Sequence, residues 1–280
     1  MAATRKVVLC ADDFGLSDGV SRGILELAEA GRISATGAMT NMPGWRRAAP
    51  DLARVTGRIG IGLHLNLTTG SPIGPMPNLA PGGAFPALRD LLARSLTGRL
   101  SLGEIRAEIA RQVVAFESVH GAAPMFVDGH QHVHVLPVVR LALLSVLTER
   151  GYQEKLWLRD PSDSGRSILG RSVGRGKALL VDILAAGFRA RAGAAGFATN
   201  DGFSGYAPFD LSVPPERIFA EAFRSLGPRP VVMCHPGYVD EELRGLDPAV
   251  ESRPLERAYL ASPAFARLLR ERGIVLSPGF

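Results

Sequence analysis

The sequence has few cysteines, few lysines and few aromatic residues. Only two of its 280 residues are cysteines, and Cys10 and Cys234 both lie inside apolar, strand-like segments. We therefore expect two buried free thiols rather than a disulfide, as in a protein of a reducing compartment. Aromatic residues make up 6% of the chain, and no basic run is interleaved with them. We expect no nucleic-acid partner, although the net charge is +5.

Long hydrophobic runs are also missing from the sequence. No apolar stretch approaches the roughly 20 residues of a membrane-spanning helix, so we expect no membrane span. The apolar run Val7–Ala11 is too short for the core of a signal peptide, which needs roughly 7–15 residues. On this basis we expect a cytoplasmic protein.

What the sequence does have is an alternation of short apolar runs with longer amphipathic ones, in a chain with 46% hydrophobic residues. This rhythm predicts an α/β fold with a parallel sheet and helices outside it. Six or seven such units fit a (β/α) barrel in a single domain, residues 1–280, better than two domains. An open doubly wound sheet usually has a glycine-rich loop after its first strand, whereas Ala11–Ser17 places two aspartates there.

The hydrophobic periodicity and the capping signals give the expected elements. Strands are expected at 6–11, 33–39, 59–65, 126–128, 155–159, 230–234 and 274–276. Helices are expected at 18–30, 45–55, 87–96, 101–119, 137–151, 178–188, 215–226 and 263–272. We expect the glycine- and arginine-rich segment 165–196 to cover the site rather than to bind phosphate.

Five of the six histidines lie at the carboxyl ends of predicted strands. They are His64, His130, His132, His134 and His235. Asp12 and Asp13 follow the first strand in the same way. The carboxyl ends of the strands of a parallel barrel share one face, so these residues should converge there although they are distant in sequence.

Carboxylates together with imidazoles suit a divalent metal ion. Aspartate oxygens suit Mg and Mn, and imidazoles suit Zn, Ni and Fe. One carboxylate of Asp12 and Asp13 can bind the ion while the other acts as a general base. The structural alternative is that this pair caps a helix or forms a turn. The run Asp128–His134 favours function, because alternate positions of an extended segment bring three imidazoles to one side.

Two residues of the strand expected at 155–159 are candidate substrate contacts. Arg159 would contact an anionic or hydroxyl group, or form an ion pair with Asp160 or Asp163. Trp157 would face a sugar or pack in the core, and the core is the commoner place for such a residue.

Taken together, the motifs resemble those of the YdjC-like carbohydrate deacetylases, which include chitooligosaccharide deacetylase and the hopanoid-associated deacetylase. The resemblance runs from Val8 to about Gly273. The matching stretches are Ala11–Ser17, Ile61–Thr68, Asp128–His134 and Met233–Gly237. The chain departs from the pattern at Gly129 and Gln131, where relatives often have serine and histidine, and it matches poorly over residues 160–200.

The resemblance implies a TIM-like barrel with seven strands, a homodimer and removal of an acetyl group from an N-acetylated sugar. It also implies that Asp13, His64 and His130 hold one divalent metal ion, Mg or Zn, and that Asp12 is the catalytic base. For such chemistry the leaving amine needs a proton, which His235 or His132 is placed to give. We also expect His132 near the substrate.

Two other functions remain open. A metal-dependent phosphoesterase or amidohydrolase on a similar barrel commonly holds two or three metal ions, whereas the first strand here offers only Asp12 and Asp13. A catalytically silent sugar-binding barrel would not need a free base beside the metal ligand.

Overall fold

The computed structural model describes residues 4–209, 211–247 and 249–280. Its strands form one parallel sheet in the order β6-β5-β4-β3-β2-β1-β8-β7, and β9 pairs with the first half of β1. The strands are β1 Arg5–Phe14, β2 Ala35–Ala38, β3 Gly60–Leu65, β4 Phe126–Gly129, β5 Trp157–Leu158, β6 Ala198–Thr199, β7 Phe203–Ser204, β8 Val231–Cys234 and β9 Ile274–Leu276.

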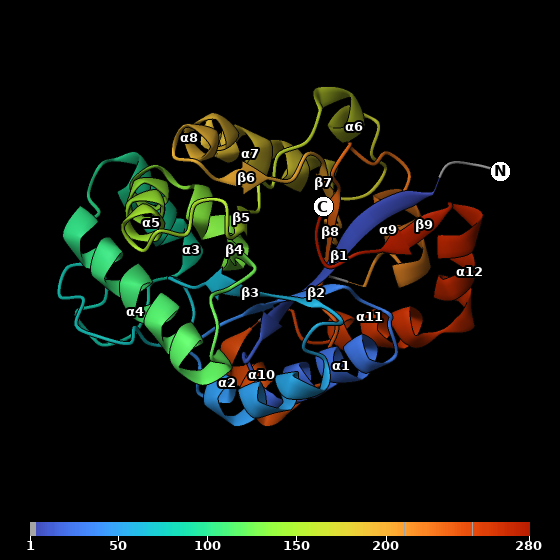
Figure 1. The fold of residues 1–280 in the computed structure, drawn as a ribbon, viewed down its shortest axis with the longest axis horizontal. Coiled ribbons are helices and arrows are strands. Elements are labelled where there is room, and N and C mark those ends of the chain that lie inside the picture. The colour runs from blue at the N-terminus through green and yellow to red at the C-terminus, as the bar shows by residue number, and fades with distance from the viewer. Residues whose placement is uncertain (1–3, 210, 248) are drawn as a thin grey trace.

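The sheet is curled, and most of the helices lie around its outside (Figure 1). The α-helices are α1 Asp18–Glu29, α2 Pro43–Ala48, α3 Leu88–Leu96, α4 Leu102–His120, α5 Pro137–Glu149, α6 Gly165–Leu169, α7 Arg175–Ala185, α8 Phe188–Ala194, α9 Pro215–Ala222, α10 Glu241–Leu246, α11 Ser252–Ala261 and α12 Pro263–Glu271. Two 3-10 helices are η1 Ala49–Arg54 and η2 His130–Val135.

Local capping explains where several helices begin. The hydroxyl of Ser101 accepts a hydrogen bond from the backbone N–H of Glu104, and that of Ser262 accepts one from Phe265. The helices expected at 101–119 and 263–272 therefore begin within one residue of their predicted starts. Serine is favoured at this position because its oxygen satisfies an amide that has no partner inside the helix.

The alternation of side chains along β1 divides the core. Val7 and Leu9 belong to the large cluster between the sheet and the outer helices. Val8 and Cys10 belong to a second cluster inside the curled sheet, together with residues of β4, β5, β7 and β8. Alternate positions of a strand face opposite sides, so Asp12 continues the inward row toward the carboxyl end of the sheet.

The prediction of a seven-stranded barrel is confirmed only as a curled parallel α/β sheet. Eight strands follow one another in the sheet, and among the described residues β6 and β7 do not pair. The strands next to this opening, β5, β6 and β7, have only two residues each, too few to give a hydrophobic period. For the same reason β6 and β7 were absent from the prediction.

Other departures have local causes. The helix expected at 45–55 is split into α2 and η1 at Pro50, which has no backbone N–H to donate. The helix expected at 178–188 is divided into α7 and α8, with Gly187 at φ +74° between them. Cys10 and Cys234 are confirmed as buried free thiols. Within the described part of the chain, no helix combines the length and hydrophobicity that spanning a membrane requires.

Candidate active site

Asp12 and Asp13 lie in β1, where the backbone departs from a regular strand. In a regular strand these consecutive side chains would point to opposite faces. Asp13 instead adopts φ +73°, and the pairing of β1 with β2 shifts register between Ala11 and Phe14. Aspartate tolerates this left-handed conformation better than most residues, and such irregularities re-aim side chains near functional sites. Both carboxylates thereby reach the same site.

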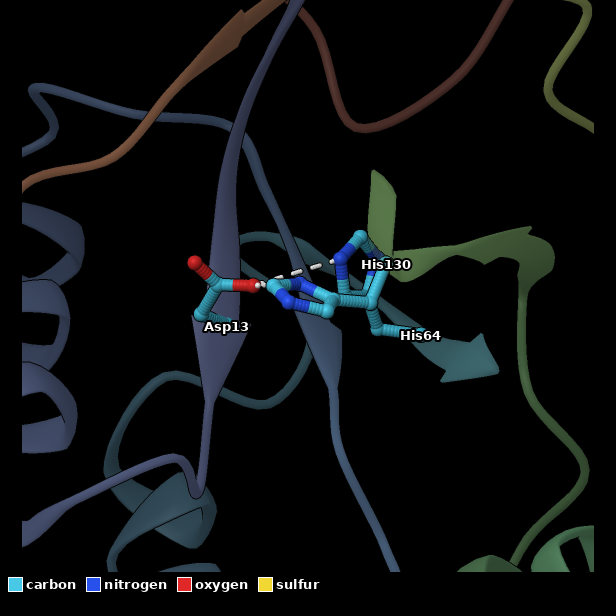
Figure 2. A group of neighbouring side chains, drawn as sticks. All are labelled: Asp13, His64 and His130. Carbon is cyan, nitrogen blue, oxygen red and sulfur yellow. Dashed lines mark hydrogen bonds and ion pairs between the residues drawn. The ribbon is translucent and has the colours of Figure 1, made fainter. Parts of the chain in front are cut away.

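Side chains from β1, β3 and the start of η2 meet around one carboxylate oxygen. Oδ1 of Asp13 lies 2.9 Å from Nδ1 of His130 and 3.3 Å from Nε2 of His64. Figure 2 shows the Asp13 carboxylate on β1 directed toward the two imidazole rings. One ligand atom from each residue lies within 4.8 Å of the others, and all three residues are buried. The predicted convergence of these residues is confirmed.

A network of charged groups holds this cluster from behind. Nδ1 of His64 donates a hydrogen bond of 2.7 Å to Oδ1 of Asp128. The guanidinium of Arg159 donates to both oxygens of Asp12 and lies 2.5 Å from Oδ2 of Asp128. The other carboxylate oxygen of Asp13, Oδ2, accepts a hydrogen bond of 2.7 Å from Arg253. Each buried carboxylate is therefore paired with a cation.

The electrostatics of the cluster favour positive charge. Burial would lower the pKa of His64, but Asp128 and Asp12 outweigh it and raise that pKa to about 10. Burial alone would raise the pKa of Asp12 and of Asp13. Arg159 nevertheless holds the pKa of Asp12 below the usual range of an aspartate. His130 and Arg253 do the same for the pKa of Asp13. Both carboxyl groups are therefore ionised at neutral pH.

The cluster opens into a cavity of about 310 Å³ at the carboxyl ends of the strands. Its polar side includes Asp12, Asp13, His64, His130, His132, Lys177, His235 and Arg253. Its other side is apolar, with leucines from α3 and α7 and the ring of Phe209. A small molecule with a polar end fits such a cavity.

Comparison of the sequence with known proteins agrees with the family resemblance of its aspartate and histidine motifs. The profile of the family described as YdjC-like protein matches residues 6–271. The chain belongs to this family. A carbohydrate deacetylase of Geobacillus stearothermophilus is 30% identical over 273 residues, which cover 97% of this chain and 96% of that protein.

Two further comparisons concern another relative and a solved structure. A chitooligosaccharide deacetylase of Serratia marcescens is 40% identical over 133 residues, a match that spans 48% of this chain and about half, 52%, of that protein. A crystal structure from Enterococcus faecalis, described as a candidate cellobiose-phosphate cleavage protein, has a TM-score of 0.73 and 23% identity, covering 98% of this chain and 97% of that one. The structural likeness shows the fold of this YdjC-like protein.

The histidines of the Asp128–His134 motif do not share one side, contrary to the prediction. The residues after β4 form η2 rather than an extended segment, with Gln131 at φ +53° and His132 at φ +60°. His132 lines the cavity and packs edge-on against Phe203 and Tyr206. The ring of His134 turns away from the cluster, and its Nε2 donates a hydrogen bond of 2.7 Å to the carbonyl of Arg159.

His235 lies just beyond β8 and lines the same cavity. Its backbone N–H donates a hydrogen bond of 2.7 Å to the buried Glu256, and its ring packs edge-on against Phe209. Burial lowers the pKa of His235 to about 4, with Arg253 and Lys177 acting in the same direction. Burial also holds the pKa of His132 well below its usual value. Both imidazoles are therefore neutral at neutral pH.

Trp157 and Arg159 do not line the cavity, in contrast to their prediction as substrate contacts. Trp157 faces the interior of the sheet, but it lies one layer below the site, where it stacks on Phe126 and contacts Phe280. Arg159 is fully buried beneath Asp12, and its ion pairs are with Asp12 and Asp128 rather than with Asp160 or Asp163. Of the two places considered for Trp157, the structure shows the core.

Three residues of the site were not singled out from the sequence. Asp128 opens the histidine motif, and its place two residues before His130 was an available signal. Arg253 comes from α11, a helix the prediction lacked. Gly37 of β2 makes room for the cluster, since a Cβ there would lie 3.1 Å from Nδ1 of His64 and 3.3 Å from Oδ1 of Asp128.

Proposed function

We propose that this YdjC-like protein is a metal-dependent hydrolase that removes the acetyl group from an N-acetylated sugar. The observation that carries the proposal is the cluster of Asp13, His64 and His130, with a second carboxylate, Asp12, beside it at the cavity. Relatives named chitooligosaccharide and carbohydrate deacetylase support the choice of substrate class.

The cluster fits one divalent ion. It offers one carboxylate oxygen and two imidazole nitrogens, which leaves coordination positions for water and substrate. Asp128 holds the other nitrogen of His64, as carboxylates commonly do for metal-bound histidines. Because two of the three ligands are imidazoles, the set favours Zn or a similar transition metal over Mg. Such an ion would polarise the acetyl carbonyl and acidify a water molecule.

Asp12 is the base in this proposal. Its carboxylate is ionised, and Arg159 fixes both of its oxygens in one orientation. A carboxylate of low pKa is a weak base, so Asp12 orients the attacking water and takes its proton as the new C–O bond forms. The amide C–N bond then breaks to release acetate, and the amine nitrogen leaves with a proton.

His235 is the better candidate to deliver that proton. Both His235 and His132 are neutral, so either must first acquire a proton during the reaction. Asp13 and Asp12 favour the protonated form of His235, whereas the strongest neighbouring charges at His132, those of His134 and Arg159, oppose it. His132 is then left to contact the sugar.

The proposal is tested by acetate release from a panel of N-acetylated monosaccharides and oligosaccharides. We expect release that a chelator abolishes and that added Zn²⁺ or another divalent ion restores. No release from any sugar by the metal-loaded protein would contradict the proposal. A parallel panel of phosphate esters then tests the phosphoesterase alternative. No hydrolysis of any substrate on either panel would favour the sugar-binding alternative.

A further inference from the structure

Helix α7 is apolar both on the side that packs against the protein and on the side that faces solvent. Ala178, Val181 and Ala185 are buried against the rest of the molecule. Leu179, Leu180 and Ile183 are 46%, 54% and 63% exposed, respectively. A helix that is hydrophobic on all sides is normally buried, so the outer side of α7 is suited to an apolar neighbour.

This outer side borders the mouth of the cavity. Leu180 and Leu184 line the cavity from α7, and Leu88 and Leu92 line it from α3. In the short helix α6, which precedes α7, Leu169 is 69% exposed. Figure 1 shows α6, α7 and α8 along one side of the molecule. The exposed apolar side chains thus continue outward from the cavity.

The same segment carries much of the positive charge of the chain. Residues 165–196 contain six basic side chains and one acidic side chain, a net charge of +5, which equals that of all 280 residues. Three of the six are exposed, lie outside the cavity and make no ion pair with a carboxylate of the described residues: Arg166, Arg175 and Arg191. We call these three side chains and Leu169, Leu179, Leu180 and Ile183 the α6–α7 surface.

We propose that the α6–α7 surface docks on an anionic lipid bilayer. Leucine and isoleucine side chains that enter the headgroup boundary, with arginine and lysine beside the lipid phosphates, are typical of interfacial helices. A second copy of this chain is the weaker occupant, because a two-fold interface would place this basic surface against itself. On a bilayer, the cavity mouth beside α7 would lie close to the lipid headgroups.

Vesicle binding tests the proposal without any substrate, so the result is independent of the proposed deacetylase activity. Full-length protein is sedimented with phosphatidylcholine vesicles and with vesicles containing 30% phosphatidylglycerol. We expect binding to the anionic vesicles only, weakened as salt is raised because the headgroup attraction is screened.

Matched variants locate the contact. Leu179→Ser with Ile183→Ser should lower vesicle binding about tenfold or more, because two apolar side chains lose their burial in lipid. Leu141→Ser on α5 is the control, since Leu141 is 53% exposed on another helix, and it should bind like the parent. Arg166→Glu with Arg175→Glu instead lowers the net charge of residues 165–196 from +5 to +1 and should abolish binding. If circular dichroism shows that the serine variant is unfolded, the glutamate variant tests whether the α6–α7 surface contacts the bilayer.

Three results would overturn the proposal. The first is no binding of the parent to anionic vesicles. The second is equal binding by the parent and by the Arg166→Glu, Arg175→Glu variant. The third is a dimeric parent together with a Leu179→Ser, Ile183→Ser variant that is a folded monomer. The last result, measured by analytical ultracentrifugation, would make the surface a subunit interface.

Discussion

Arg159 donates two hydrogen bonds to Asp12, one to each carboxylate oxygen, and each is 2.7 Å long. The same guanidinium pairs with Asp128, which accepts a hydrogen bond from His64. One buried arginine therefore connects the proposed base to a proposed metal ligand. It fixes the orientation of both without reaching the cavity.

Replacing Arg159 should destabilise the protein strongly. Arg159→Met leaves Asp12 and Asp128 buried without their cation, and breaking a buried ion pair in this way costs about 3–5 kcal/mol. The free energy of unfolding, measured in urea, checks this expectation. Arg89→Met is the control, because the Arg89 side chain is 87% exposed beside Asp90 and its loss should change stability by less than about 0.5 kcal/mol. Similar values for both variants would refute the account of the network.

The proposed metal ligands are tested by metal content. His64→Ala and His130→Ala should each lose bound metal, because each removes one of only three protein ligands. His132→Ala should keep the metal, since His132 packs on Phe203 and Tyr206 outside the cluster. Elemental analysis of the three purified variants measures this directly. Unchanged metal in the first two would remove those histidines from the ligand set.

The two candidate acids should separate in kinetics. His235→Ala should lower kcat by roughly 10²–10⁴ with metal content unchanged, the usual range for loss of a general acid. His132→Ala should mainly raise KM, because we assign His132 to sugar binding. Steady-state kinetics on an active acetylated sugar distinguish these outcomes, and the opposite pattern would exchange the two roles.

Much of this site was predictable from the sequence because it depends on strand ends. The motifs at Asp12, His64, His130 and His235 each follow an apolar run, and parallel strands bring their carboxyl ends together. What the sequence could not show was local backbone geometry. The positive φ of Asp13 reverses the expected direction of its side chain, and those of Gln131 and His132 separate three histidines that a regular strand would align.

Long-range pairing was equally hidden. Arg159 was expected to contact the substrate or to pair with Asp160 or Asp163, but its partners Asp12 and Asp128 come from other strands. Arg253 reaches Asp13 from 240 residues away in the chain. The opening of the sheet escaped prediction because β6 and β7 are too short to show a period.

Glu256 should make stability depend on pH. Burial raises its pKa from 4.5 to about 7, so between these values the folded state holds a proton that the unfolded state has lost. Stability from this group therefore falls as pH rises through that window. Glu256→Gln removes the buried charge, and we expect its stability relative to the parent to improve by about 1–3 kcal/mol between pH 5 and pH 8. Urea unfolding at both pH values measures the difference, and a constant difference would refute the assignment.

The most direct test of the central claim is acetate release by Asp12→Asn, with bound metal measured on the same sample. We expect full metal occupancy, because Asp13, His64 and His130 remain in place. We also expect a loss of turnover of about 10²–10⁴, because asparagine cannot accept the proton. Loss of the metal would show that Asp12 is a ligand, and parent-like acetate release would show that it is not the base. Either result would contradict the division of roles between Asp12 and Asp13.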